Sequence, residues 1–235
     1  MSFDKIKQLA YAANRRLPEL GLVLFTFGNA SAADHTHGVF AIKPSGVPYA
    51  DLTVESMVVV DFDGQVVEGE LRPSSDTLTH ALLYKNWSHV GGIVHTHSTY
   101  GTAWAQAQRP IPIYGTTHAD HLTVDIPCAP PMADELIRGN YEHETGWQII
   151  RHLEAEGLDP IEVEMILVGN HAPFTWGATA DKAVYNSAVL EECARMAYLT
   201  EQLNPEVPKL KESLVRKHWA RKHGAGAYYG QGGVK

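Results

Sequence analysis

Residues 91–97 read Gly91-Gly92-Ile93-Val94-His95-Thr96-His97, a short apolar run that ends in two histidines. An apolar run of this length is typical of a buried strand. Side chains two positions apart on a strand point to the same face, so both imidazoles are expected to leave the strand end together. Two neutral imidazoles on one face can bind one divalent ion at about 2.0–2.1 Å. The stretch therefore predicts both a central strand and half of a metal site.

Further elements are predicted on both sides of this stretch. Apolar residues recur at helical spacing from Ile6 to Leu17, and Pro18 is expected to end that helix. Asp63-Gly64 predicts the turn of a hairpin. The other predicted strands cover 22–27, 39–43, 57–62, 65–68 and 163–168, and the other predicted helices cover 78–85, 102–108, 144–156, 181–203 and 209–223. Strands that alternate irregularly with helices, with a hairpin among them, indicate an α/β protein: a mixed sheet covered by helices on both faces.

The composition narrows the class of protein. The chain has 235 residues, 44% of them hydrophobic, and no linker or repeat before residue 224, so one domain over 1–235 with a glycine-rich tail at 224–235 is predicted. A net charge of −8 argues against a protein that coats nucleic acid. No apolar run approaches the roughly 18 residues of a membrane span. The charged start and the two cysteines, Cys128 and Cys193, favour a cytoplasmic protein with reduced thiols.

A third histidine and a carboxylate extend the candidate metal site. His171 follows the predicted strand 163–168 directly, and Asp76 stands at a predicted helix start as a fourth ligand or a nearby carboxylate. Three histidines with one open position are typical of a catalytic zinc site. His35 and His37 have the same spacing as the first pair but lie among polar turn residues, so they are interpreted as surface residues.

Three loops are candidates for binding an anion. They read Gly28-Asn29-Ala30-Ser31, Lys43-Pro44-Ser45-Gly46 and Pro73-Ser74-Ser75-Asp76. The last precedes a predicted helix, and helix N-termini attract anions through unpaired N–H groups. A small phosphate is plausible there despite the negative net charge, although each loop taken alone is a weak signal that ordinary turn or cap chemistry explains better.

Six motifs occur in order along the chain. They are the three loops above, His-Thr-His-Ser at 95–98, Gly-Thr-Thr-His-Ala-Asp at 115–120 and Ala-Tyr-Tyr-Gly-Gln at 227–231. In these motifs the chain resembles the class II aldolase superfamily, and within it the branch of L-ribulose-5-phosphate 4-epimerases. The resemblance implies a three-layer α/β/α sandwich around a mixed, mostly antiparallel sheet. It also implies a homotetramer with active sites between subunits, and no nucleic-acid or membrane partner.

The resemblance also implies roles for individual residues, carried over position by position. The metal ligands fall on Asp76, His95, His97 and His171, and the substrate-binding residues on Gly28, Asn29, Ser45, Gly46, Ser74 and Ser75. The two acid/base groups fall on Asp120 and Tyr229. Glu142 and His218 are secondary candidates near the site, and His121 receives no role.

The residue at position 76 decides between branches of the superfamily. The sugar-phosphate aldolases carry glutamate there, whereas this chain has Asp76, as the epimerases do. The implied reaction interconverts L-ribulose 5-phosphate and D-xylulose 5-phosphate by cleavage of C3–C4, rotation of the aldehyde and re-addition, in arabinose or ascorbate catabolism. The implied cofactor is one Zn²⁺ per subunit, with Mn²⁺ or Co²⁺ as alternatives. The rival functions are an aldolase that stops after cleavage, a dehydratase, and a non-catalytic interaction module of the same fold.

Overall fold

The computed structural model describes residues 3–223 and residue 227, and its centre is one eight-stranded sheet. The strands run in the order β4 (Val66–Glu68), β3 (Val58–Asp61), β2 (Val39–Ile42), β1 (Asn29–Asp34), β5 (Gly92–His95), β8 (Pro173–Gly177), β7 (Met165–Val168) and β6 (Cys128–Ala129). Neighbouring strands are antiparallel except β6 and β7, which are parallel. The prediction of a mixed, mostly antiparallel sheet is confirmed.

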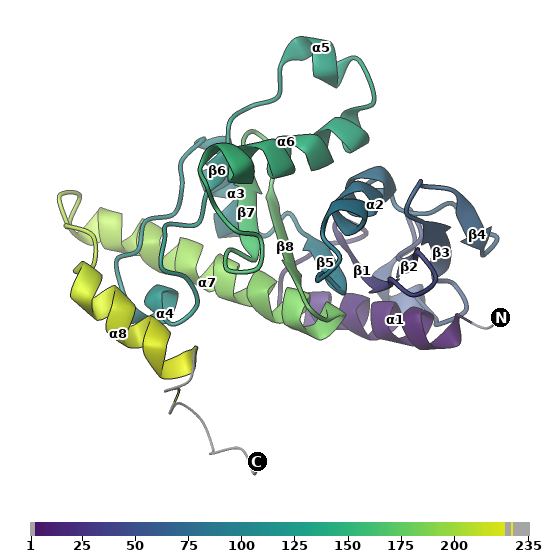
Figure 1. Ribbon diagram of the computed structural model, residues 1–235, viewed down its shortest axis with the longest axis horizontal. Coiled ribbons are helices and arrows are strands. Elements are labelled where there is room, and N and C mark those ends of the chain that lie inside the picture. The colour runs from purple at the N-terminus through teal and green to yellow at the C-terminus, as the bar shows by residue number, and fades with distance from the viewer. Residues whose placement is uncertain (1–2, 224–226, 228–235) are drawn as a thin grey trace.

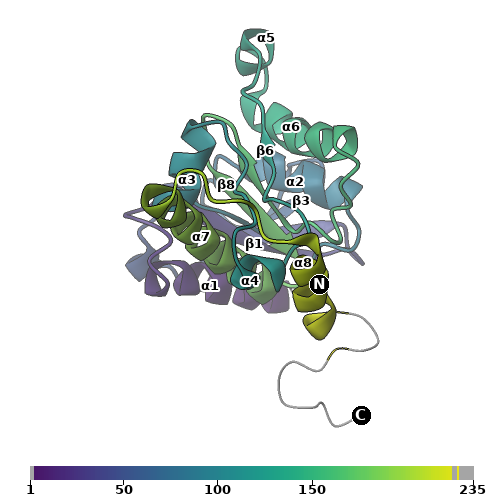
Figure 2. The ribbon, with the colours of Figure 1, turned by 90° about the vertical axis from the view of Figure 1, so that its left-hand side faces the viewer.

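Helices cover both faces of this sheet (Figure 1). The long helices α1 (Asp4–Glu19) and α7 (Ala180–Leu203) pack on one face together with α3 (Thr99–Gln106). The helices α2 (Thr77–Asn86) and α6 (Tyr141–Ala155) cover the other face. Figure 2 shows the three layers from the side, with α8 (Glu212–Lys222) packed against the short α4 (Thr116–Ala119). The remaining short helices are η1 (Tyr49–Asp51) and α5 (Asp134–Ile137).

Successive side chains of a central strand point to opposite faces of the sheet, so each strand contributes to two separate hydrophobic cores. In β5, Ile93 contributes to the cluster under α2 and α6, whereas Val94 contributes to the cluster under α1 and α7. All four residues of β5 are buried, because a central strand covered on both faces has no solvent side. A Cβ at Gly92 would lie 2.3 Å from the Cα of Ala180, so glycine allows the start of α7 to reach the strand. This close approach fixes α7 beside the strand that carries His95.

Several sequence-based boundaries need correction. The predicted strand 22–27 is wrong: the segment is a loop in which Leu24 and Phe25 are 68% and 81% exposed, and Phe25 has a φ of +52°. The strand at this place is β1, which begins at Asn29. Pro18 lies inside the last turn of α1, where its fixed φ fits, and does not end the helix before it.

The other expectations agree with the structure to within a few residues. The helices predicted at 102–108 and 144–156 each begin three residues earlier than expected, and β8 was not predicted. Both cysteines are free thiols, and none of the described helices is long and apolar enough to cross a membrane.

Candidate metal centre and active site

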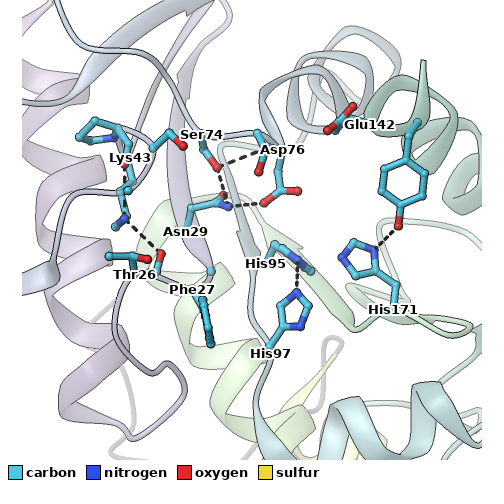
Figure 3. Close-up of a pocket in the computed structure, with 16 residues that line it drawn as sticks. Thr26, Phe27, Asn29, Lys43, Ser74, Asp76, His95, His97, Glu142 and His171 are labelled. Atoms are coloured by element: carbon cyan, nitrogen blue, oxygen red, sulfur yellow. Dashed lines mark hydrogen bonds between the residues drawn. The ribbon is translucent and has the colours of Figure 1, made fainter. Parts of the chain in front are cut away.

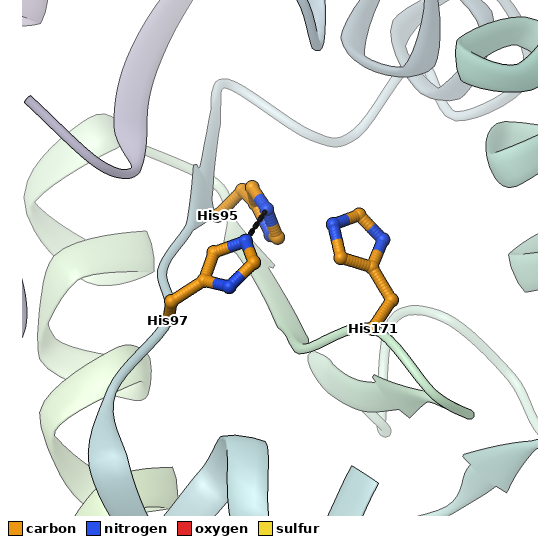
Figure 4. Close-up of side chains that lie close together, drawn as sticks. All are labelled: His95, His97 and His171. Carbon is orange, nitrogen blue, oxygen red and sulfur yellow. Dashed lines mark hydrogen bonds between the residues drawn. The ribbon is translucent and has the colours of Figure 1, made fainter. Parts of the chain in front are cut away.

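Three histidines from two separate parts of the chain meet where the central strands of the sheet end. His95 ends β5, His97 follows two residues later, and His171 lies in the turn between β7 and β8. Their imidazoles face a common space, as Figure 4 shows, and one nitrogen of each lies within 4.8 Å of the others. Pairing of His95 with Phe174 across β5 and β8 brings the two parts together, and their rings stack at 4.1 Å. The structure thus groups the three histidines that the sequence predicted.

The protonation of these rings suits metal binding. His95 Nδ1 lies 3.0 Å from the carbonyl oxygen of Pro173 and donates to it, which leaves a lone pair on Nε2. That Nε2 is 3.2 Å from His97 Nε2, close to the edge of about 3.3 Å that two nitrogen ligands make in a tetrahedral zinc site. Burial lowers the pKa of His95 and of His171 to about 3, and it also lowers the pKa of His97. Neutral imidazoles whose nitrogen atoms converge in this way fit a divalent ion.

Asp76 lies beside this group at the start of α2. Its Oδ2 accepts a hydrogen bond of 2.6 Å from the Asn29 side-chain amide, which also donates to Ser74 Oγ at 3.0 Å. The carboxylate acts to raise the pKa of His97 and of His171, so its charge is felt at the cluster. Among the described residues, however, the group whose ligand atoms meet within 4.8 Å contains the three histidines and not Asp76. The structure places Asp76 next to the candidate metal site, and its role as a ligand stays a prediction.

A pocket of about 520 Å³ opens beside the histidines. Figure 3 shows Lys43 and Ser74 on one side of it and His171 on the other. All six predicted substrate-binding residues line it: Gly28, Asn29, Ser45, Gly46, Ser74 and Ser75. Glu142, a secondary candidate, also lines it. The structure therefore brings the three loops and the histidines together at one cavity, while the binding role of each loop residue stays a prediction.

Lys43 is a feature of this pocket that sequence reasoning did not select. Its side chain is almost fully buried, and its Nζ donates to the carbonyl oxygens of Thr26 (3.4 Å) and Pro44 (3.3 Å). Burial lowers the pKa of its ammonium group to about 8. A buried lysine held by carbonyls beside hydroxyl-bearing loops supplies positive charge to an anion site. The signal was present in the sequence, because Lys43 begins one of the three loops.

Tyr141 is a second lining residue that was missed. Its hydroxyl lies 3.4 Å from His171 Nδ1. Ligand histidines commonly make such a contact through their second nitrogen, which fixes the orientation of the ring. The first turn of α6 therefore supports the candidate metal site from the side opposite the loops.

Asp120 does not line this pocket in its own chain. It follows α4, and its carboxylate accepts hydrogen bonds from His218 Nδ1 (2.9 Å) and from Arg221 Nε (2.8 Å) and Nη2. Burial acts to raise the pKa of Asp120, but the bonds from Arg221 and His218 lower it to about 2. His218 is thus joined to Asp120, whereas the neighbouring His121 bonds to Tyr185 Oη at 2.7 Å. Tyr229, the other predicted acid/base group, lies outside the described residues.

The second His-x-His pair has a different environment. His35 and His37 lie in the turn between β1 and β2. His35 Nε2 bonds to the carbonyl oxygen of Val90 at 2.7 Å, and the exposed His37 pairs with Asp34 at 2.7 Å. Neither joins a metal-binding group among the residues that the structure describes. Of these two pairs with equal spacing, the one at the buried strand end joins a cluster of histidines.

Comparison with known proteins gives consistent results. Residues 8–198 match the family described as Class II Aldolase and Adducin N-terminal domain. Two similar proteins are named L-ribulose-5-phosphate 4-epimerase UlaF, from Salmonella paratyphi B and Salmonella typhi. Each is 51% identical to this chain over 228 residues, which covers 97% of this chain and 99% of the relative. A solved structure of L-fuculose 1-phosphate aldolase superposes with a TM-score of 0.77 at 25% identity, covering 93% of this chain and 96% of that one.

The described fold, the histidine cluster and these similarities agree with one another. The family match spans more than half of the chain, and the curated relatives are matched over almost their whole length. The chain belongs to the class II aldolase and adducin N-terminal domain family.

Proposed function

We propose that this chain is a metal-dependent epimerase that interconverts L-ribulose 5-phosphate and D-xylulose 5-phosphate. The observation that carries the proposal is the single pocket that joins His95, His97 and His171 to three loops rich in hydroxyl and amide donors. Similarity to proteins named for this activity, at 51% identity over 97% of the chain, supports the choice of substrate. A volume of about 520 Å³ lies within the range of about 300–1,000 Å³ that small-molecule sites usually occupy.

The loops are proposed to bind the phosphate of the substrate. Ser45, Ser74 and Ser75 offer hydroxyl groups, and Lys43 offers the positive charge on the same side of the pocket. Gly28, Asn29 and Gly46, which line the same pocket, complete the proposed set. Several donors to one phosphate would hold the sugar by the end away from the histidines. The reacting carbons would then lie near the metal site.

The metal is proposed to be one Zn²⁺ per subunit, held by His95, His97 and His171 with Asp76 beside them. When bound, such an ion supplies Lewis-acid stabilisation of charge that develops on the substrate oxygens. Three histidines with an open position suit zinc best, and Mn²⁺ or Co²⁺ could occupy the same donors.

The proposed reaction separates and rejoins the two halves of the sugar. A base takes the proton of the C4 hydroxyl, and the electron pair of the C3–C4 bond moves into an enediolate of the three-carbon half. The C4 half becomes glycolaldehyde phosphate, still held by its phosphate. Rotation presents the other face of the aldehyde, and re-addition with return of the proton inverts C4. No atom is gained or lost.

Asp120 and Tyr229 are the proposed acid/base groups. The Asp120 carboxylate accepts a hydrogen bond from His218 Nδ1. Because Asp120 is not in the wall of its own chain's pocket, a second copy of the chain would have to bring it there. This supports the proposal of a homotetramer with active sites between subunits, each subunit being a single domain. A cytoplasmic location, in arabinose or ascorbate catabolism, fits a charged substrate that does not cross a lipid bilayer.

An aldolase is the second candidate, because a solved L-fuculose 1-phosphate aldolase superposes with a TM-score of 0.77. The deciding experiment incubates the purified, metal-loaded protein with L-ribulose 5-phosphate. We expect D-xylulose 5-phosphate without free aldehyde. Accumulation of glycolaldehyde phosphate would favour an aldolase, and an unchanged substrate would contradict both functions.

A further inference from the structure

A seam of polar side chains connects the candidate active site to the interior between β1 and α2. Asn29 and Ser31 lie two residues apart on one face of β1, and Asp76, His80 and Tyr84 follow one another at intervals of four residues at the start of α2 and along it. Two residues of strand span about 6.7 Å and four residues of helix about 6 Å, so the two rows stay in register. Asn29 faces Asp76 at the first step, and Ser31 faces His80 at the second.

The hydroxyl of Ser31 joins two groups in the interior. It lies 2.7 Å from His80 Nδ1 and 2.7 Å from Tyr84 Oη. Ser31 and His80 have no exposed surface, and Tyr84 is 1% exposed. The rest of this core is apolar, with Phe40, Ile93 and Phe174 around the seam. A buried polar network of this kind stabilises the fold only if each donor and acceptor is satisfied.

Two atoms of the seam have no hydrogen-bond partner among the described residues: His80 Nε2 and Asn29 Oδ1. Asn29 and His80 are each at most 1% exposed, so water outside the protein does not satisfy these atoms. The orientation of the Asn29 amide is fixed, because a carboxylate only accepts and the amide NH₂ must face Asp76. Asn29 Oδ1 is therefore a buried acceptor that lacks a donor.

The donor directions in the seam follow from counting hydrogens. If His80 donated from Nδ1 to Ser31, and Ser31 donated to Tyr84, then the Tyr84 hydrogen would have no acceptor among the side chains of the seam. His80 Nε2 would also be a second buried acceptor without a donor. If Tyr84 donates to Ser31 and Ser31 to His80 Nδ1, each hydroxyl is satisfied and His80 carries its proton on Nε2. The second arrangement pairs one buried donor, His80 Nε2–H, with one buried acceptor, Asn29 Oδ1.

We propose that His80 is a positioning residue. Tyr84 and Ser31 hold it as the Nε2–H tautomer, and this N–H, through one internal water, keeps the Asn29 amide turned toward Asp76. One water can join two atoms up to about 5.6 Å apart, which suits adjacent steps of a seam spaced by about 6 Å. The chain of donors then runs one way, from Tyr84 through Ser31, His80 and the water to Asn29 and finally to Asp76. The inference deepens the proposed function, because it rests on Asp76 acting in the site.

Neutron diffraction from a crystal grown in D₂O tests the hydrogen positions without reference to activity. We expect deuterium on His80 Nε2 and on Tyr84 Oη toward Ser31, no deuterium on His80 Nδ1, and one water between His80 and Asn29. Deuterium on Nδ1, or no water between the two atoms, would overturn the proposal. Because this measurement does not need turnover, it remains decisive even if the proposed reaction is wrong.

Kinetics of matched variants test the positioning role. Ser31→Ala removes the central hydroxyl, and Thr175→Val removes a buried hydroxyl on the opposite face of the sheet, which donates to Ala183 O at 2.9 Å. Both variants should lose similar stability, but only Ser31→Ala should lower kcat, by about three- to tenfold, the value of one hydrogen bond. Bound metal should not change in either. Equal kcat values for the two variants would overturn the role.

Tyr84→Phe provides a second variant in case Ser31→Ala folds poorly. It keeps the ring and removes only the first donor of the chain, so it should lower kcat in the same direction as Ser31→Ala. A Tyr84→Phe protein with reduced stability and the kcat of the wild type would mean that the seam only stabilises the fold.

Discussion

The carboxylate of Glu191, on α7, accepts the backbone N–H of Gly101 at 2.8 Å, and its other oxygen accepts that of Tyr100 at 2.9 Å. These N–H groups belong to the first turn of α3, which has no side-chain cap of its own. A carboxylate at this place also interacts favourably with the helix dipole. Since α3 begins two residues after His97, Glu191 fixes the segment that carries this candidate ligand.

Glu191→Ala should therefore lower the free energy of unfolding by about 1.5–3 kcal/mol, because two N–H groups lose a charged acceptor. Its neighbour Glu192 makes an exposed ion pair with Arg195, so Glu192→Ala should change stability by less than about 0.5 kcal/mol. Urea unfolding of the two variants measures the difference. Similar values for both would contradict the capping role.

His97→Asn should remove most of the bound metal together with the activity, because it takes away one of three converging nitrogens. The exposed His37, whose pair has the same spacing, provides the control: His37→Asn should leave metal content and turnover unchanged. Metal content is measured by elemental analysis of the purified proteins. Full occupancy in the His97 variant would place the ion elsewhere.

Ser75→Ala should weaken binding of the phosphorylated sugar about ten- to a hundredfold, since a hydrogen bond to a charged phosphate contributes about 1.5–3 kcal/mol. Ser88 is an exposed serine just beyond the other end of α2, and Ser88→Ala should have no effect. Substrate affinity measured by calorimetry separates the two. An unchanged affinity in Ser75→Ala would assign the phosphate to other residues.

Lys43 should give the reaction a pH limit on the alkaline side. Burial lowers the pKa of its ammonium group from 10.5 to about 8, so the substrate-free protein loses this positive charge as pH rises through about 8. The substrate phosphate, whose second pKa is about 6, is fully ionised at this pH. Loss of the positive charge on Lys43 therefore weakens the attraction between the protein and the phosphate. We expect kcat/KM to fall above pH 8 in the wild type. Lys43→Met should show a higher KM and no such fall; the same fall in both proteins would assign it to another group.

The proposal that sites are shared between subunits predicts complementation. Asp120→Asn and Tyr229→Phe should each be inactive, with turnover reduced by about 10²–10⁴. If the two residues act from different chains, subunits of both kinds mixed by mild dissociation and reassembly should form some complete sites. Recovered activity in hybrids verified by mass is the expected result. Hybrids as inactive as their parents would mean that both residues serve the site of one chain.

The sequence predicted the grouping of the three histidines better than it predicted the elements around them. His95 and His97 were paired correctly because a strand has a period of two, and His171 because it follows a clear apolar strand. In contrast, β1 was missed because it is formed by Asn-Ala-Ser-Ala-Ala-Asp, without branched or aromatic residues. Small side chains are needed there because helices cover both faces of the strand. The strand propensity of single residues does not predict this packing.

Two other features depend on contacts far apart in the chain. The segment 22–27 has the apolar residues of a strand but no partner strand, so it is a loop. Asp120 is bonded to Arg221, which lies 101 residues later in the sequence. No local sequence pattern predicts that α8 binds this carboxylate away from the pocket of the same chain.

The candidate metal ligands are far apart in the sequence, so they are synthesised at different times. His95 and His97 leave the ribosome well before His171, and the three meet only when β8 has paired with β5. A growing chain that stops short of residue 171 would hold two ligands and bind the ion weakly. Uptake of the proposed metal would therefore be a late step, and the ion would stabilise only chains whose central strands have already paired. Retention of the metal would report that a newly made chain has completed the centre of its fold.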